Sequence, residues 1–330
     1  MTYLARGPFV HMVLLAIVSI AACPNCFRTS AAEVTELPPS HSVQPELFAT
    51  GFEFAEGPAF DRDGNLFVVN YRGNGNIGRI SADGTASVWC VLDELAPIEG
   101  QKSQANGLKV DSEGRLVVAD AGGGRLLRVA ADGKSVEVLA DRWDGTRFNS
   151  INDVALDTKG NIYFSDPGGS NAEKPIGSVY RFSISTNAVV RLATGLAFPN
   201  GLAVTADQKQ LCVSESSRYR LMIYDLVDDQ AENERVLIEF PQQDAGIIRG
   251  GSFDPDGMIF DASGHLYVAM WVGGVINVVD VVTGKLLRQY DAGGLKATNC
   301  HFHDGYLYTT VAAKEAVFRL KLGVNGFRYN

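Results

Sequence analysis

Six oxygen-bearing side chains recur at one position of a repeated sequence pattern. Each copy has Asp, Asn or Glu, then usually Gly, an apolar residue, an Asp-x-x-Gly turn and three or four strand-forming residues, with residues 255–269 as the clearest example. Carboxylate and amide oxygens are the ligands that a hard cation such as Ca²⁺ prefers, at about 2.3–2.6 Å. The recurring residues are therefore candidate metal ligands: Glu56, Asn106, Asn152, Asn200, Asp256 and Asn299.

A purely structural explanation exists for these side chains. Asn and Asp before Gly commonly satisfy backbone N–H groups in turns, and for a single copy that explanation would be preferred. Six copies in register favour a shared site, although repeats also inherit turn chemistry. Glu56 is the most informative member, because Glu is a poor turn residue and a good metal ligand.

The repeat also predicts the elements that position these residues. Asp-x-x-Gly supplies a tight turn in which Gly adopts a positive φ angle, and the run after it has strand-forming residues, so each copy is a β-hairpin. Copies begin about 43 to 56 residues apart, which is the length of a four-stranded propeller blade. We expect an all-β, six-bladed β-propeller with four-stranded antiparallel blades, in which the six residues surround the central channel.

The first 32 residues read as a signal peptide rather than part of the fold. Residues 10–22 are almost wholly apolar, which suits a secretory leader and is too short for a membrane-spanning helix. Cleavage is expected at the small residues 30–32, and lipidation of Cys23 is the alternative. We therefore expect a periplasmic or secreted protein with no integral membrane domain, a polar lead-in at 33–42 and one propeller at 43–330.

Charge and cysteine content narrow the classes of function. The net charge is −9, and without a run of Lys or Arg a nucleic-acid partner has no electrostatic support. Beyond the leader region only Cys90, Cys212 and Cys300 remain. An odd number of cysteines within strand-like sequence predicts buried free thiols, with one disulfide pair as the alternative.

Several motifs together resemble the SMP-30/gluconolactonase/LRE-like family. They are Glu56-Gly57-Pro58, Pro199-Asn200-Gly201-Leu202, Pro255-Asp256-Gly257-Met258, Trp271-Val272-Gly273-Gly274 and Thr298-Asn299-Cys300. The resemblance extends over about residues 45–322. It implies a six-bladed propeller that hydrolyses lactones or related esters with the help of one divalent cation.

Residue roles follow from the same resemblance. It implies a metal, most often Ca²⁺ with Zn²⁺, Mn²⁺ or Mg²⁺ as alternatives, held by Glu56, Asn200 and Asp256. Asp256 is also the general base that the family suggests, and Asn152 is the amide that contacts the substrate. The partner is then a small lactone or ester, and the sequence leaves the oligomeric state open.

Other polar residues near the repeat position are secondary candidates. Asn106 and Asn299 are expected to contact the substrate, and Asp153, which replaces the usual Gly, either enters the site or is a turn acid that faces solvent. Strand-end acids could bind substrate or cap turns, and Asp166 is preferred for the site over Asp120 and Glu215. His301 and His303 share a strand face, and both are either proton shuttles or structural residues.

One departure from the family pattern leaves the substrate open. Sugar lactonases of the family often carry Arg two residues before the third amide, where this chain has Ser150. Loop cations that could replace it are Arg147, Lys174, Arg218 and Arg249. Residues 142–150 could form a lid over the channel, and residues 225–251 either an extended blade edge or such a lid. The alternative to a hydrolase is a non-catalytic propeller that binds a small ligand or glycan.

Overall fold

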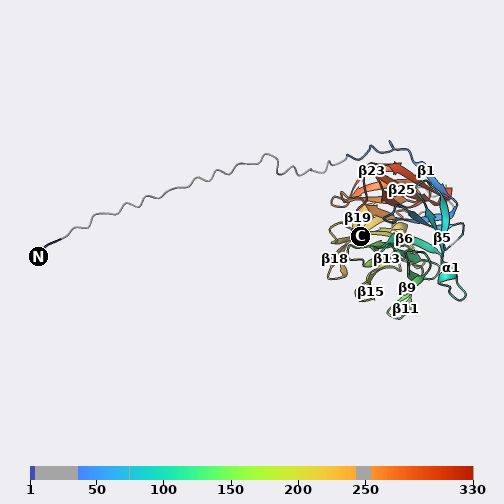
Figure 1. Cartoon of the computed structure of the whole chain (residues 1–330), viewed down its shortest axis with the longest axis horizontal. Helices are drawn as coiled ribbons and strands as arrows, with labels where there is room; N and C mark the ends of the chain where they lie inside the picture. Colours follow the sequence, from blue (N-terminus) through green and yellow to red (C-terminus); the bar gives the residue numbers. More distant parts are fainter. Residues whose placement is uncertain (4–35, 74, 243–253, 330) are drawn as a thin grey trace. The chain divides into compact units, whose positions relative to one another are not determined.

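The computed structural model describes residues 1–3, 36–73, 75–242 and 254–329, and nearly all regular structure in them is β-strand (Figure 1). The predicted leader, apart from its first three residues, lies outside this part. The only α-helix among the described residues is the single turn α1 (Leu92–Leu95). No helix there is long and apolar enough to cross a membrane.

The first three blades follow the chain, each as an antiparallel sheet of four consecutive strands. Blade 1 contains β2 (Phe52–Phe60), β3 (Leu66–Tyr71), β4 (Asn76–Ile80) and β5 (Ala86–Val91). Blade 2 contains β6 (Ala105–Val110), β7 (Leu116–Asp120), β8 (Arg125–Val129) and β9 (Val136–Ala140). Blade 3 contains β12 (Val154–Leu156), β13 (Ile162–Asp166), β14 (Gly177–Ser183) and β15 (Ala188–Leu196), after the small hairpin β10 (Arg142–Trp143) and β11 (Thr146–Arg147).

The remaining blades repeat this order until the last one, which borrows its outer strand from the start of the fold. Blade 4 contains β16 (Pro199–Val204), β17 (Gln210–Glu215), β18 (Arg220–Val227) and β19 (Gln230–Glu239). Blade 5 contains β20 (Met258–Phe260), β21 (His265–Met270), β22 (Val275–Asp280) and β23 (Lys285–Asp291). Blade 6 contains β24 (Ala297–His303), β25 (Tyr306–Val311), β26 (Ala316–Lys321) and, as its outer strand, β1 (Glu46–Thr50).

The six blades close into a ring. Their first strands contact one another in the order β2, β6, β12, β16, β20, β24 and back to β2. Hydrophobic residues pack between every two adjacent blades, so each of the six interfaces has a core of its own. The predicted six-bladed propeller is therefore confirmed.

The Asp-x-x-Gly turns form as expected in four blades. In the first, the Asp61 carboxylate accepts hydrogen bonds from the backbone N–H groups of Asp63 and Asn65 at 3.0 and 2.8 Å, and Gly64 has a φ angle of +82°. The turns that begin at residues 111, 157 and 261 repeat the pattern. These turns fix where each first strand ends and hence the register of the residues at the axis.

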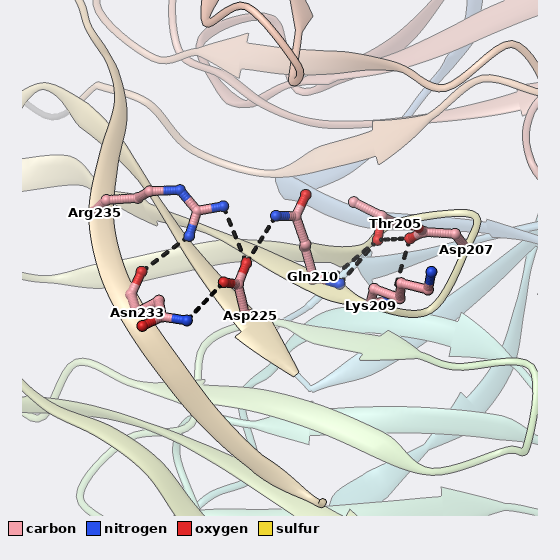
Figure 2. Close-up of polar contacts among 7 residues, drawn as sticks. All are labelled: Thr205, Asp207, Lys209, Gln210, Asp225, Asn233 and Arg235. Atoms are coloured by element: carbon pink, nitrogen blue, oxygen red, sulfur yellow. Dashed lines mark hydrogen bonds and ion pairs between the residues drawn. The ribbon is translucent and has the colours of Figure 1, made fainter. Parts of the chain in front are cut away.

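Blade 4 shows how the chain manages without that turn (Figure 2). The Thr205 hydroxyl donates to Asp207 at 2.7 Å and accepts from the Gln210 backbone N–H at 3.0 Å. Asp225 in β18 accepts hydrogen bonds from Gln210 in β17 and Arg235 in β19. Of the two interpretations of residues 225–251, the extended blade edge is thus correct as far as Glu239. Residues 243–253 lie outside the described residues.

The three thiols are distributed over different interfaces. Cys90 is buried between blades 1 and 2, Cys212 between blades 4 and 5, and Cys300 between blades 5 and 6. All three are free, which confirms the expected buried thiols. Burial raises the pKa of each thiol to about 12.

Candidate functional site

Four of the six repeat-position residues meet, together with Asp153, where the first strands come close together at the axis. Glycines permit this approach: a Cβ on Gly107 would lie 2.1 Å from Asp153 Oδ1, and one on Gly257 would lie 2.1 Å from Asn299 Cγ. The side chains are almost completely buried, with exposed fractions of 6% or less. Those buried at the axis are Glu56, Asp153, Asn200, Asp256 and Asn299.

Amide groups connect the carboxylates of this cluster. Asn299 Nδ2 donates to Asp153 Oδ2 at 3.2 Å, and the same amide lowers the pKa of Glu56. The amide of Asn200 likewise lowers the pKa of Asp256. Side chains from five of the six blades therefore contribute to one cluster, and Asp153 belongs to it rather than facing solvent.

The electrostatics of the cluster reflect three carboxylates in one poorly solvated space. Burial raises the pKa of Glu56 to about 8, and the charge of Asp153 adds to the rise. Burial also raises the pKa of Asp256 well above its ordinary value, with further contributions from Glu56 and Asp153. Burial likewise raises the pKa of Asp153, while the ammonium of Lys109 opposes this. A cation at the cluster would relieve the repulsion.

The available donors suit a hard divalent cation. No three His, Cys, Asp or Glu side chains in the described part of the chain form a ligand group, so the candidate set is mixed: carboxylates from Glu56 and Asp256 and amides from Asn200 and Asn152. The Asn152 Oδ1 atom is buried and finds no hydrogen-bond partner in that part. A buried oxygen left in this way costs about 1–3 kcal/mol, which a bound cation or substrate donor would offset.

A pocket of about 240 Å³ has Asn152 among its lining residues. Its polar wall consists of Asn70, Gln104, Asn106, Ser150 and Asn152. None of the described lining side chains is charged. The lining is completed by apolar side chains from Phe54, Ala105, Ala121, Pro167 and Phe198. Such a pocket provides hydrogen bonds to hydroxyl and carbonyl groups and apolar contact, with no charge to bind an anionic group.

The pocket lining follows a rule of register. Phe54, Gln104, Ser150 and Phe198 each stand two residues before a repeat-position residue of their blade. Alternate residues of an extended segment face the same way, which applies to the first three; Phe198 has a φ angle of +61° and departs from the extended conformation. From the sequence, this spacing was applied only to Ser150, and Phe54, Gln104 and Phe198 were not predicted. The same spacing from Glu56, Asn106 and Asn200 could have found them.

Polar residues at the ends of the second strands hold these lining segments. Asp120 accepts from Gln104 N at 2.8 Å, Asp166 from Ser150 N at 3.0 Å, and Glu215 from Ala197 N at 2.8 Å. In blade 1, Asn70 donates to Phe54 O at 2.9 Å. These residues position the pocket wall, and Asp120, Asp166 and Glu215 do so from behind the pocket rather than from within its lining.

Comparison with known proteins identifies the family. Residues 54–313 match the family model described as the SMP-30/Gluconolactonase/LRE-like region. The chain belongs to this family. The resemblance found in the sequence motifs is therefore confirmed over most of the chain.

Two relatives and one solved structure illustrate the family's range. A gluconolactonase of Zymomonas mobilis is 27% identical over 85% of this chain and 82% of its own length. A diisopropyl-fluorophosphatase of Loligo vulgaris is 30% identical over 82% of this chain and 90% of its own. The structure of a gluconolactonase from Xanthomonas campestris has a TM-score of 0.68 at 25% identity and covers 87% of this chain and 97% of that one.

The cations suggested to compensate for Ser150 do not line this pocket. Arg147 donates to Asp141 and to the carbonyl oxygen of Gly123, and Arg218 pairs with Glu215 at 3.0 Å. Lys174 is not part of the lining, and Arg249 lies outside the described residues. Residues 142–147 form the β10–β11 hairpin, and Ser150 itself belongs to the pocket wall.

His301 and His303 do not line the Asn152 pocket. Both line a second cavity together with Lys109 and the last residues of the chain. His303 stacks on Phe60 with ring centroids 4.3 Å apart. A role as proton shuttle at the Asn152 pocket is therefore not supported by their placement.

Proposed function

We propose that this protein is a lactone hydrolase that uses a divalent cation held by Glu56, Asn200 and Asp256, with Ca²⁺ as the preferred ion. The observation that carries the proposal is the convergence of these side chains at the axis with Asp153, whose neighbour in the chain, Asn152, has a buried Oδ1 without a hydrogen bond in the described structure and lines a pocket. Family membership and the gluconolactonases among the relatives support the reaction class. The ion's identity rests on the oxygen-only donor set.

The residues divide the chemical work between them. A divalent cation, when bound, polarises a lactone carbonyl and lowers the pKa of water. Asp256, which lies in the cluster beside Glu56, is the residue assigned to accept a proton from the attacking water at its carboxylate. Asn152 and Asn106 orient the substrate, and Phe54 and Phe198 limit the access of bulk water to the pocket. The ring-opening of a lactone yields a hydroxy acid.

The pocket lining also favours a class of lactone. Five amide or hydroxyl side chains and two phenyl rings offer hydrogen bonds and apolar faces, a combination that suits polyhydroxylated rings. No Lys, Arg or His side chain is in the described lining, so a phosphorylated or carboxylated substrate has no side-chain ion-pair partner there. We infer an uncharged lactone as substrate and, from the leader sequence at residues 1–32, a protein exported to the periplasm or the medium.

Hydrolysis in a pH-stat tests the reaction class. The substrates are aldonolactones, aliphatic lactones and aryl esters, each measured before chelation, after chelation and after Ca²⁺ is added back. We expect an uncharged lactone to be hydrolysed with a rate that EDTA abolishes and Ca²⁺ restores. Binding of these compounds without turnover would instead favour a non-catalytic propeller.

Replacement of Asp256 tests the assignment of the base. Asp256→Ala should lower kcat by roughly 10²–10⁴-fold, the usual contribution of a general base, and should weaken metal binding. Asp132→Asn, an exposed turn acid, is the matched control and should leave the rate unchanged. Near-normal turnover in folded Asp256→Ala protein would exclude the assigned role.

A further inference from the structure

A second cavity lies at the opposite end of the central channel. It has a volume of about 420 Å³, within the range of small-molecule sites. The first strands line it with residues that stand two to four positions beyond the repeat position, about 7–13 Å further along the strand. They include Phe60, Lys109, Leu156, Ile259 and His301.

The last residues of the chain form one wall of this cavity. Ala262 N donates to Asn325 O at 2.8 Å, and Phe327 N donates to Phe260 O at 2.9 Å. The Tyr329 hydroxyl donates to Val204 O at 2.6 Å. This terminal segment, residues 324–329, is thus attached to blades 4 and 5, and the wall exists without a ligand.

The cavity has more cationic than acidic side chains, in a chain whose net charge is −9. Arg62 and Arg328 are exposed at its edge, and neither forms an ion pair with the residues that the structure describes. Lys109 Nζ donates to the carbonyl oxygen of Leu108 at 3.1 Å. Of the two acids in the lining, Asp61 already accepts three hydrogen bonds in its turn; the other is Asp304.

The histidine in the cavity is prepared to accept a hydrogen bond. His301 Nδ1 lies 3.0 Å from the carbonyl oxygen of Phe302, and because a carbonyl only accepts, Nδ1 carries the proton. With the proton on Nδ1, Nε2 of the neutral ring is an acceptor. The cavity therefore pairs donors for an anionic group with an acceptor for a hydroxyl group.

We propose that this far cavity binds small hydroxycarboxylates, with Lys109, Arg62 and Arg328 around the carboxylate and His301 accepting from a hydroxyl group. The rings of Phe60 and Phe327 and the side chain of Ile259 provide apolar contact for the carbon chain. This binding is separate from the Asn152 pocket and does not depend on the proposed reaction. It would nevertheless let the protein bind the class of molecule that lactone hydrolysis produces.

Calorimetry on metal-stripped protein tests the ligand class. Sodium gluconate is titrated first, then sorbitol, which lacks the carboxylate, and sodium hexanoate, which lacks the hydroxyl groups. We expect gluconate to bind and the other two to bind at least about tenfold more weakly, a difference of about 1.4 kcal/mol. The absence of gluconate binding at millimolar concentration, or equal binding of all three, would overturn the proposal.

Variants at both ends of the channel locate the binding. Lys109→Met and the double variant Arg62→Gln/Arg328→Gln should each weaken gluconate binding by about tenfold, whereas Arg72→Gln, an exposed arginine elsewhere, should not. The double variant keeps the test valid if Lys109→Met does not fold. Asn152→Ala should leave this binding unchanged. Unchanged affinity in the double variant, or its loss in Asn152→Ala, would assign gluconate to another site.

Discussion

At the scale of single residues, Asn152 is the clearest sign of a missing partner. Its Oδ1 atom is buried without a hydrogen bond in the described structure, whereas Asn299 uses both ends of its amide, towards Asp153 and Cys300 N. A folded protein retains an unsatisfied buried oxygen at a cost. We infer that Asn152 is retained because its Oδ1 binds a ligand, and not because it stabilises the fold.

This contrast predicts opposite effects for two Asn substitutions. Asn152→Ala should leave the melting temperature unchanged or slightly higher while lowering kcat/KM by at least about tenfold, since it removes only a ligand-facing amide. Asn299→Ala should lower the melting temperature, because it leaves Asp153 Oδ2 without its donor. Thermal melts and steady-state kinetics on both variants provide the check; a clear loss of stability in Asn152→Ala would argue for a structural amide.

Glu56 predicts how the metal-free protein responds to pH. Its pKa rises from 4.5 to about 8 on folding, so between these values the folded state binds more protons than the unfolded state. Stability is therefore highest below pH 4.5 as far as this group is concerned, and it falls as pH rises through 8. Each unit of separation is worth at most about 1.4 kcal/mol.

Urea unfolding of chelated protein between pH 5 and 9 measures this slope. We expect the free energy of unfolding to decline with pH, Glu56→Gln to flatten the decline, and added Ca²⁺ to restore stability at the alkaline end. A chelated wild-type protein whose stability rises over this range would contradict the buried, uncompensated carboxylate.

At the scale of elements, the close approach of the first strands depends on glycine. A Cβ at Gly257 would collide with the Asn299 amide, whereas one at Gly264, in the Asp-x-x-Gly turn of the same blade, meets nothing within 4 Å. Gly264→Ala adds only the cost of its φ angle of +89°, roughly 1–2 kcal/mol. The two positions therefore separate backbone strain from disruption of the site.

We predict that Gly257→Ala weakens metal binding and destabilises the fold by roughly 1–3 kcal/mol or more, while Gly264→Ala destabilises without changing metal affinity. Calorimetric metal titration combined with thermal melts distinguishes the two variants. Equal metal affinity in both would mean that the axial packing does not position the ligands.

A feature of the structure could be predicted from the sequence where the residues that form it are close together in the chain or occupy the same position of the repeat. Asp61 and Gly64 form their turn from neighbouring residues, and Glu56 and Asp256 share a register, so blades and axis could be predicted from the repeat. Asp166 could not be assigned in this way, because its role depends on Ser150 N, which another segment supplies. Residues 324–329, which form a wall of the second cavity, lie outside the repeat, so the repeat pattern could not predict their position.

At the scale of the whole molecule, β1 closes the ring. It pairs with β26 from Glu46–Arg319 to Thr50–Ala316, so the first and last parts of the propeller make one sheet. Without β1, the edge of β26 would be unpaired and prone to association. The preceding residues add contacts, since the Tyr290 hydroxyl donates to Pro38 O at 2.8 Å.

Truncation tests this closure. Protein beginning at Glu36 should fold normally, whereas protein beginning at Phe52 should melt at least about 5 °C lower and aggregate on concentration. Melting curves and light scattering on the two proteins are sufficient. Equal stability and solubility would show that blade 6 is complete without its borrowed strand.

The proposed reaction requires Glu56, Asn200 and Asp256 to share one cation. Its most direct test is calorimetric titration of Ca²⁺ into chelator-stripped protein, alongside Glu56→Gln, Asn200→Ala and Asp256→Asn, with Asp132→Asn as control. We predict one ion per chain for wild type and control, and affinity lowered by roughly a hundredfold in each axial variant. No binding by wild-type protein, or wild-type affinity in all three variants, would contradict the proposed metal site.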